Sequence, residues 1–166
     1  MPHQEPVAAA LARLSKAQAK CAKELKALSK SHAASPAWAS SGIAAVVRLC
    51  HDPASAAAAA ATLGRLTKDD TYDDRIREAG AVLPLVALLS GGLESDAANR
   101  AAGVLGNLAY GDEASRVAMV EAGAVPLLVA LLSGGPESDV AGRAAATLAN
   151  LASDDDDANQ AAITEA

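Results

Sequence analysis

Two kinds of polar side chain recur in this chain at a fixed distance and could form a binding surface. Arg100 and Asn107 are followed, 43 residues later in each case, by Arg143 and Asn150. Guanidinium and amide groups hydrogen-bond carboxylates, phosphates and peptide groups, but near neutral pH an arginine stays protonated and an amide neither gains nor loses a proton. These residues therefore indicate binding rather than catalysis.

No catalytic constellation accompanies these residues in the sequence. The three histidines are His3, His32 and His51, and none stands with a serine or cysteine in a recognisable nucleophile motif. The two Ser-Gly-Gly turns lack the Lys and the Ser or Thr that complete a phosphate-binding loop. We predict no enzymatic activity and no cofactor.

Acidic residues collect at the boundaries between repeated segments, most densely at Asp154–Asp157. Calcium binding is one interpretation, but an EF-hand loop would need a third ligand at Ala158 and a glycine at Asn159. A negative charge near the amino end of a helix is stabilised by the helix dipole, which explains acidic residues at every boundary. Cys21 and Cys50 have no spacing suited to zinc. We therefore predict no metal site.

The elements that must carry the arginines and asparagines are copies of one another. The sequence EAGAVLPLVALL at Glu78–Leu89 returns as EAGAVPLLVALL at Glu121–Leu132. Each copy is predicted to form three helices separated by glycines. The first helices are Asp73–Ala79 and Glu113–Ala122, the second Ala81–Ser90 and Ala124–Ser133, and the third about Asp96–Ala109 and Asp139–Ala152, with Ser95 and Ser138 or the following aspartates as caps. Helical repeats with a period of about 40–47 residues are typical of an α-solenoid.

The repeat divides the chain into five segments. Residues 69–111 and 112–153 are full copies, and residues 154–166 begin a further copy with its first helix. Residues 35–68 are a degenerate copy, in which Arg65 and Lys68 stand where the next copy has Asn107 and Tyr110. Residues 1–34 contain a basic amphipathic helix, which we expect to cap the first repeat. A short coiled coil and a targeting or membrane-surface segment are the alternatives for this helix.

Composition favours a helical protein inside the cell. The chain has 166 residues, of which 51% are hydrophobic, and this is enough for a core. A net charge of −6 argues against a nucleic-acid partner, which would require a basic face. No stretch resembles a transmembrane span or a secretory signal. We expect a cytoplasmic or nuclear location, or both.

The order of these motifs resembles the armadillo repeat, and specifically the alanine-rich armadillo repeats of plant and algal proteins. The shared features are a short helix, an AG turn, a second helix with PLLVALL, an SGG turn and a third helix ending in LxNLA, over about residues 36–166. The resemblance implies an all-α, right-handed α-solenoid whose third helices line a concave groove for extended peptides. In peptide-binding members an Asn near the end of the third helix grips the ligand backbone, which implies this role for Asn107 and Asn150. A Trp four residues earlier forms side-chain pockets, but Gly103 and Ala146 stand there in this chain.

We therefore predict a scaffold that binds an extended segment of a partner protein. The predicted peptide-binding residues are Arg65, Arg100, Asn107, Tyr110, Arg143 and Asn150. Guanidinium and amide groups over small residues would suit a segment that carries carboxylates or phosphates. The alternative is that the asparagines only connect repeats and the arginines are solvated.

Two further functions follow from the resemblance alone. One is the substrate-recognition part of a U-box-type ubiquitin ligase. The other is a nuclear import adaptor, against which the missing tryptophans argue. The last repeat also lacks a neighbour to cover it, so self-association through that end is a further expectation.

Overall fold

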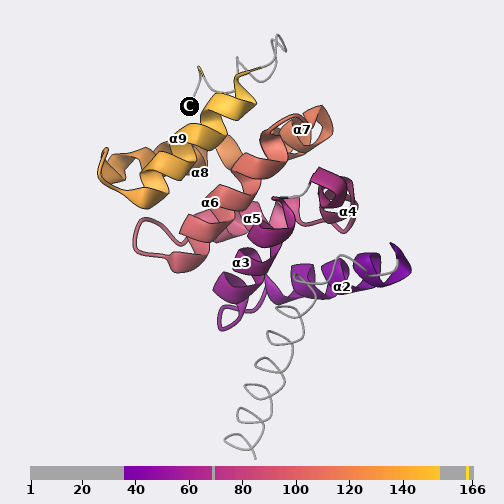
Figure 1. Ribbon diagram of the computed structural model, residues 1–166. Coiled ribbons are helices and arrows are strands. Elements are labelled where there is room, and N and C mark those ends of the chain that lie inside the picture. Colours follow the sequence, from indigo (N-terminus) through magenta and orange to yellow (C-terminus); the bar gives the residue numbers. More distant parts are fainter. Residues whose placement is uncertain (1–35, 69, 154–163, 165–166) are drawn as a thin grey trace, which may run out of the picture.

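The computed structural model describes residues 36–68, 70–153 and 164, and this part of the chain contains helices and no strands (Figure 1). The predicted amino-terminal helix of residues 1–34 lies outside the described residues, as does nearly all of the segment 154–166. The helices are α2 (Pro36–Leu49), α3 (Ala56–Leu66), α4 (Asp73–Glu78), α5 (Val82–Leu89), α6 (Asp96–Ala109), α7 (Glu113–Glu121), α8 (Ala124–Leu131) and α9 (Asp139–Leu151), with 3₁₀ turns at Asp70–Tyr72 and Leu132–Gly134.

The helices form layers that repeat along the chain. Helices α4, α5 and α6 make one layer, and α7, α8 and α9 make the next. The third helices pack side by side in the order α3, α6, α9, while α5 packs against α8 (Figure 1). This arrangement confirms the predicted all-α, right-handed solenoid of three-helix repeats. It also places the third helices, which carry the predicted site, on one face of the molecule.

Glycine and proline set the corner between the first and second helix of each layer. Gly80 and Gly123 both have a φ of 75°, the left-handed conformation that ends a helix at little cost only for glycine. Pro84 and Pro126 are each the third residue of their helix, because α8 begins one residue earlier in its copy than α5. The first four N–H groups of a helix have no helical acceptor, so neither proline removes a hydrogen bond.

Helices α6 and α9 begin at the same point of the repeat because a serine caps each of them. The Ala98 N–H donates to Ser95 Oγ at 3.1 Å, and the Ala141 N–H donates to Ser138 Oγ at 3.5 Å. Of the two predicted kinds of cap, the serine makes the bond and the aspartate after it lies in the first turn. Such a cap stabilises a helix by about 1 kcal/mol, so it fixes where α6 and α9 start.

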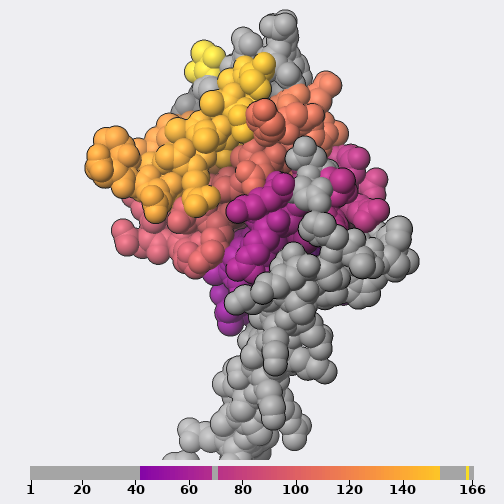
Figure 2. Space-filling model, viewed as in Figure 1, coloured from indigo at the N-terminus to yellow at the C-terminus, as the bar shows by residue number. Residues whose placement is uncertain are grey.

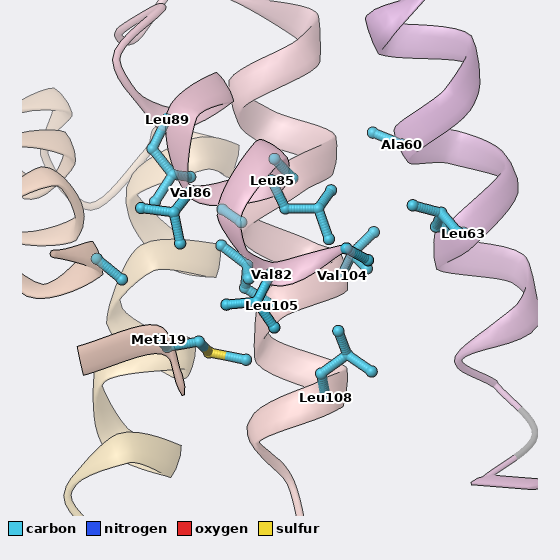
Figure 3. Close-up of a cluster of buried hydrophobic side chains, with 14 of the residues drawn as sticks. Ala60, Leu63, Val82, Leu85, Val86, Leu89, Val104, Leu105, Leu108 and Met119 are labelled. Atoms are coloured by element: carbon cyan, nitrogen blue, oxygen red, sulfur yellow. The ribbon is translucent and has the colours of Figure 1, made fainter. Parts of the chain in front are cut away.

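Leucine, valine and alanine form a continuous core between the layers. Figure 3 shows Leu105 of α6 among Val82 of α5 and Met119 of α7, with Leu63 of α3 on the far side of Val104. Leu63, Leu105 and Met119 are 0% exposed. Several alanines of α3, α6 and α9 are also fully buried, and their small side chains let neighbouring third helices approach closely.

No single helix in the described part of the chain is both long and apolar enough to cross a membrane. Helix α7 and the segment Ala124–Gly134 meet the requirement only when taken together, and they are bent by 85° relative to each other.

An ion pair joins the two full layers. Arg77 Nε of α4 lies 3.2 Å from Asp112 Oδ2, and Arg77 Nη2 lies 2.7 Å from Asp74 Oδ1. Burial of the Asp112 carboxylate disfavours its charged form, but hydrogen bonding from Ser115 and the charge of Arg77 outweigh this. The pKa of Asp112 is therefore lowered from its ordinary value of 3.8.

We expect Asp112→Asn to lower the free energy of unfolding by about 1 kcal/mol at neutral pH, since the pair is partly exposed. A carboxylate with a lowered folded-state pKa stabilises the protein above its unfolded pKa of about 3.9. The stabilisation is lost as the pH falls through the lowered folded-state pKa, so the difference between wild type and variant should shrink once the pH falls below the unfolded pKa. Urea unfolding of wild type and Asp112→Asn, carried out from neutral to acid pH, measures the difference in their free energies of unfolding. Glu113→Gln, which changes the adjacent exposed carboxylate, is the control, and an equal loss in both variants would contradict the ion pair's role.

Candidate peptide-binding groove

A groove with a volume of about 360 Å³ lies on the face formed by the third helices. In Figure 2 the surfaces of α3, α6 and α9 lie next to one another on the face that is viewed. The residues that line the groove come from α6, α9 and the ends of α3 and α6, namely Thr67, Ala102, Gly103, Gly106, Asn107, Tyr110, Arg143, Ala146, Thr147 and Asn150. Four of the six predicted site residues are therefore together: Asn107, Tyr110, Arg143 and Asn150.

Each asparagine of the groove uses one N–H to contact the preceding repeat. Asn107 Nδ2 donates to Thr67 Oγ1 at 3.0 Å, and Asn150 Nδ2 donates to the Gly106 carbonyl at 2.9 Å. The bonding between repeats that we considered as an alternative is thus present at both positions. An amide group has a second N–H and a carbonyl oxygen, so these bonds leave both residues with hydrogen-bonding capacity in the groove.

Arg143 lies across the groove floor on a glycine. A Cβ atom added to Gly103 would come within 2.5 Å of Arg143 Nη1, so the arginine occupies the space that a side chain at residue 103 would fill. Arg143 makes no ion pair or hydrogen bond through its guanidinium within the described ranges. The groove therefore contains a guanidinium that has no acidic partner among the residues that the structure describes.

Arg100 holds the same place in its repeat but behaves differently. Its Nε lies 2.9 Å from Asp96 Oδ2, one helical turn earlier, and the residue does not line the groove. Arg143 also has an aspartate one turn earlier, Asp139, yet the two form no ion pair. The difference follows from the preceding third helix, where Ala61 stands in place of Gly103 and its methyl group leaves less room for the next arginine.

Of the remaining predicted residues, Tyr110 lies at the edge of the groove and Arg65 lies outside it. Tyr110 lines the groove and is 78% exposed, so its ring is available to a ligand. Arg65 is exposed on α3 and does not line the groove. Its role in binding stays a prediction.

The structure adds two threonines that the sequence analysis did not include. Thr147 is 0% exposed, and its hydroxyl lies 3.0 Å from the Ala102 carbonyl and 2.9 Å from the Arg143 carbonyl. Thr67 is 5% exposed, and its hydroxyl oxygen accepts the hydrogen bond from Asn107 Nδ2. A signal for Thr147 was available, since it replaces the apolar Val104 of the preceding copy at a buried position.

Other chemistry has little support in the part of the chain that the structure describes. No group of three or more His, Cys, Asp or Glu side chains there could hold a metal ion, while Asp154–Asp157 lies outside it. Cys50 is 3% exposed, and burial raises the pKa of its thiol to about 11. A thiol that stays protonated at neutral pH is a poor nucleophile, so Cys50 belongs to the core.

Residues 112–153 match the family described as armadillo/beta-catenin-like repeat. Among solved structures, an engineered protein is 35% identical, with a TM-score of 0.67 over 75% of this chain and 30% of that one. A second engineered protein is 28% identical, with a TM-score of 0.73 over 91% of this chain and 63% of that one. A designed armadillo repeat protein in complex with the peptide (KR)4 is 26% identical, with a TM-score of 0.67 over 75% of this chain and 52% of that one.

This chain thus spans between 30% and 63% of the length of these similar structures. No curated protein matches it.

Proposed function

We propose that this chain, which is an armadillo repeat protein, is a non-catalytic scaffold that binds an extended segment of a partner protein along the face of α3, α6 and α9. A similar designed armadillo repeat protein has been solved with a peptide bound, which supports this function. The groove lies where successive third helices meet, and an extended chain crossing it would meet equivalent residues of successive repeats.

We further propose that the bound segment is acidic or phosphorylated. The observation that carries this proposal is Arg143, a groove residue that has no acidic partner within the described ranges. A guanidinium binds a carboxylate or a phosphate through two parallel hydrogen bonds, and such charge-assisted bonds are about twice as strong as neutral ones. The peptide (KR)4 of the designed protein is basic, so the similarity in fold does not determine the charge of the ligand here.

The remaining groups of the groove suit the main chain of such a segment. Asn107 and Asn150 each offer a carbonyl oxygen and a second N–H beyond the bond to the preceding repeat. An extended peptide presents its own N–H and C=O groups without internal partners. Arg143 would thus select for charge, while the amides would hold any extended backbone.

The test compares binding of three fluorescent peptides, (DE)4, (QS)4 and (KR)4, by anisotropy. We expect (DE)4 to bind best, and we expect Arg143→Glu to weaken its binding at least tenfold, since bonds to charged groups contribute about 1.5–3 kcal/mol. Gly103→Ala, which forces the Arg143 guanidinium to move, should weaken binding severalfold. The control is Arg48→Glu, the same charge change at an exposed residue of α2.

The outcomes separate the two parts of the proposal. Equal losses in Arg143→Glu and Arg48→Glu would mean that net charge, and not the groove, determines binding. Tighter binding of (KR)4 than of (DE)4 would overturn the acidic ligand but leave the scaffold. No binding of any of the three peptides would overturn the scaffold.

A further inference from the structure

A second groove, with a volume of about 340 Å³, lies between the two full layers at the corner where α4 turns into α5. We call it the corner groove. Its two sides are formed by Gly80, Val82 and Leu83 at the corner and by Ala118, Glu121 and Ala122 at the end of α7. None of these residues lines the groove of the third helices, so the two grooves are separate surfaces.

The corner groove is largely apolar and exposes a leucine. Leu83 is 66% exposed, which is more than any other leucine, isoleucine or valine in the described part of the chain. Val82 beside it is buried, and Ala118 and Ala122 are half-buried with side chains too small to fill the space. Single exposed leucines are common on protein surfaces, but one that lines an apolar groove marks a place where a partner can cover it.

The corner groove lies between two described layers, so its opening does not depend on where the described chain ends. The first helix of a further repeat would lie against α8, as α7 lies against α5, and would meet Pro126, the counterpart of Leu83. The combination of residues is also specific to this junction. Between α2 and α4, Ala44 stands in place of Leu83, and the long side chain of Arg75 stands in place of Ala118.

The rim of the corner groove is negatively charged. Glu121 is exposed, and its carboxylate makes no ion pair or hydrogen bond with the residues that the structure describes. Arg77 also lines the groove, but its guanidinium is shared between Asp74 and Asp112, so this cluster has a net negative charge. The last turn of α7 contains no basic residue to offset the partial negative charge at the carboxyl end of a helix. A cation is therefore favoured beside Glu121.

We propose that the corner groove binds a segment of a partner protein that places a large apolar side chain next to a lysine or arginine. The apolar side chain packs on Leu83 and the two alanines, and the cation pairs with Glu121. Lysine and arginine have apolar stems, so either can lie along the same surface and keep its charge at the rim. The volume is at the lower end of the range of about 300–1,000 Å³ for small-molecule pockets, and few polar groups converge on it, which favours an inserted side chain.

The test measures the binding of three fluorescent peptides to the full chain by anisotropy. The peptide (ALKA)3 has the proposed pairing, (ALEA)3 replaces its lysines by acids, and (ASKA)3 replaces its leucines by serines. We expect (ALKA)3 to bind more tightly than the other two. Leu83→Ser should weaken this binding by about tenfold or more, because it removes the apolar contact. Glu121→Gln should weaken it only about two- to fivefold, and less at high salt, since an exposed ion pair contributes little.

The chain offers a matched control for each variant. Leu93→Ser changes another exposed leucine, and Glu113→Gln changes an exposed carboxylate at the start of α7, and neither residue lines the corner groove. Both controls should bind (ALKA)3 as wild type does. Circular dichroism shows whether all four variants remain folded.

Several results would overturn the proposal. The first is that (ALKA)3 binds no better than (ALEA)3 or (ASKA)3, and the second is that Leu83→Ser and Leu93→Ser cause equal losses. Binding of (ALKA)3 only after serine has replaced the leucines of the basic amino-terminal segment would assign the groove to that segment instead, the leucines being Leu11, Leu14, Leu25 and Leu28. Arg143→Glu should not weaken the binding of (ALKA)3, so this proposal and that for the groove of the third helices can fail independently.

Discussion

Replacing Leu105 by alanine should lower the free energy of unfolding by roughly 2–5 kcal/mol, because it removes a fully buried side chain and leaves a cavity. Leu105 is 0% exposed and lies at the centre of the core that joins α5, α6 and α7 (Figure 3). The surrounding helices are held by contacts to both neighbouring layers, so they can collapse only partly into the space. Urea unfolding followed by circular dichroism measures the change.

Leu148→Ala is the matched control for Leu105→Ala. Leu148 is the same residue at the equivalent position of the last layer, but it is only half-buried. Its truncation should therefore cost clearly less than that of Leu105. Both proteins are compared at the lowest measurable concentration, so that association does not contribute. Equal losses would mean that the centre of the described solenoid is no better packed than its end.

The Gly106→Leu variant should be destabilised by roughly 1–3 kcal/mol or more, because the contact between α6 and α9 has no room for a side chain. A Cβ atom alone would lie 2.9 Å from Thr147 Oγ1, and that hydroxyl is buried and bonded to the Ala102 carbonyl. Thr147 cannot turn away without breaking this bond. The temperature and the urea concentration at the midpoint of unfolding should both decrease.

Gly142→Leu makes the same substitution where there is space. Gly142 is an exposed residue of α9, and a Cβ added there meets no atom within 4 Å. Leucine has a higher helix propensity than glycine by somewhat under about 1 kcal/mol, so this variant should be slightly more stable than wild type. Opposite signs at the two glycines are the expected result. A stabilised Gly106→Leu variant would show that the two third helices can separate freely.

The sequence predicts the helices of this fold well because each copy repeats the same local signals. Helix α6 spans Asp96–Ala109 as predicted, with a serine before it and an apolar stripe of helical period along it. The corners at Gly80 and Gly123 follow from glycine's access to left-handed φ. Signals of this kind act within one helix or turn, so reading the chain in order detects them.

The side-chain geometry of the groove is less predictable, because it depends on contacts between repeats. Arg100 and Arg143 are equivalent in sequence, yet one pairs with Asp96 and the other lies on Gly103. The difference depends on a residue of the preceding third helix, about 40 positions away. The hydrogen bonds from Asn107 and Asn150 to the preceding repeat also join residues about 40 positions apart in the sequence. A period identifies equivalent positions, but it does not show which neighbour each side chain contacts.

The carboxyl end of α6 is completed by residues that come later in the chain. The last four carbonyls of a helix lack helical donors, and here Asn150 donates to the Gly106 carbonyl while Arg116 Nη1 donates to the Ala109 carbonyl at 3.0 Å. Helix α6 thus depends on the layer that follows it for an intact final turn. Opening of α7 or α9 should therefore speed amide hydrogen exchange in the final turn of α6.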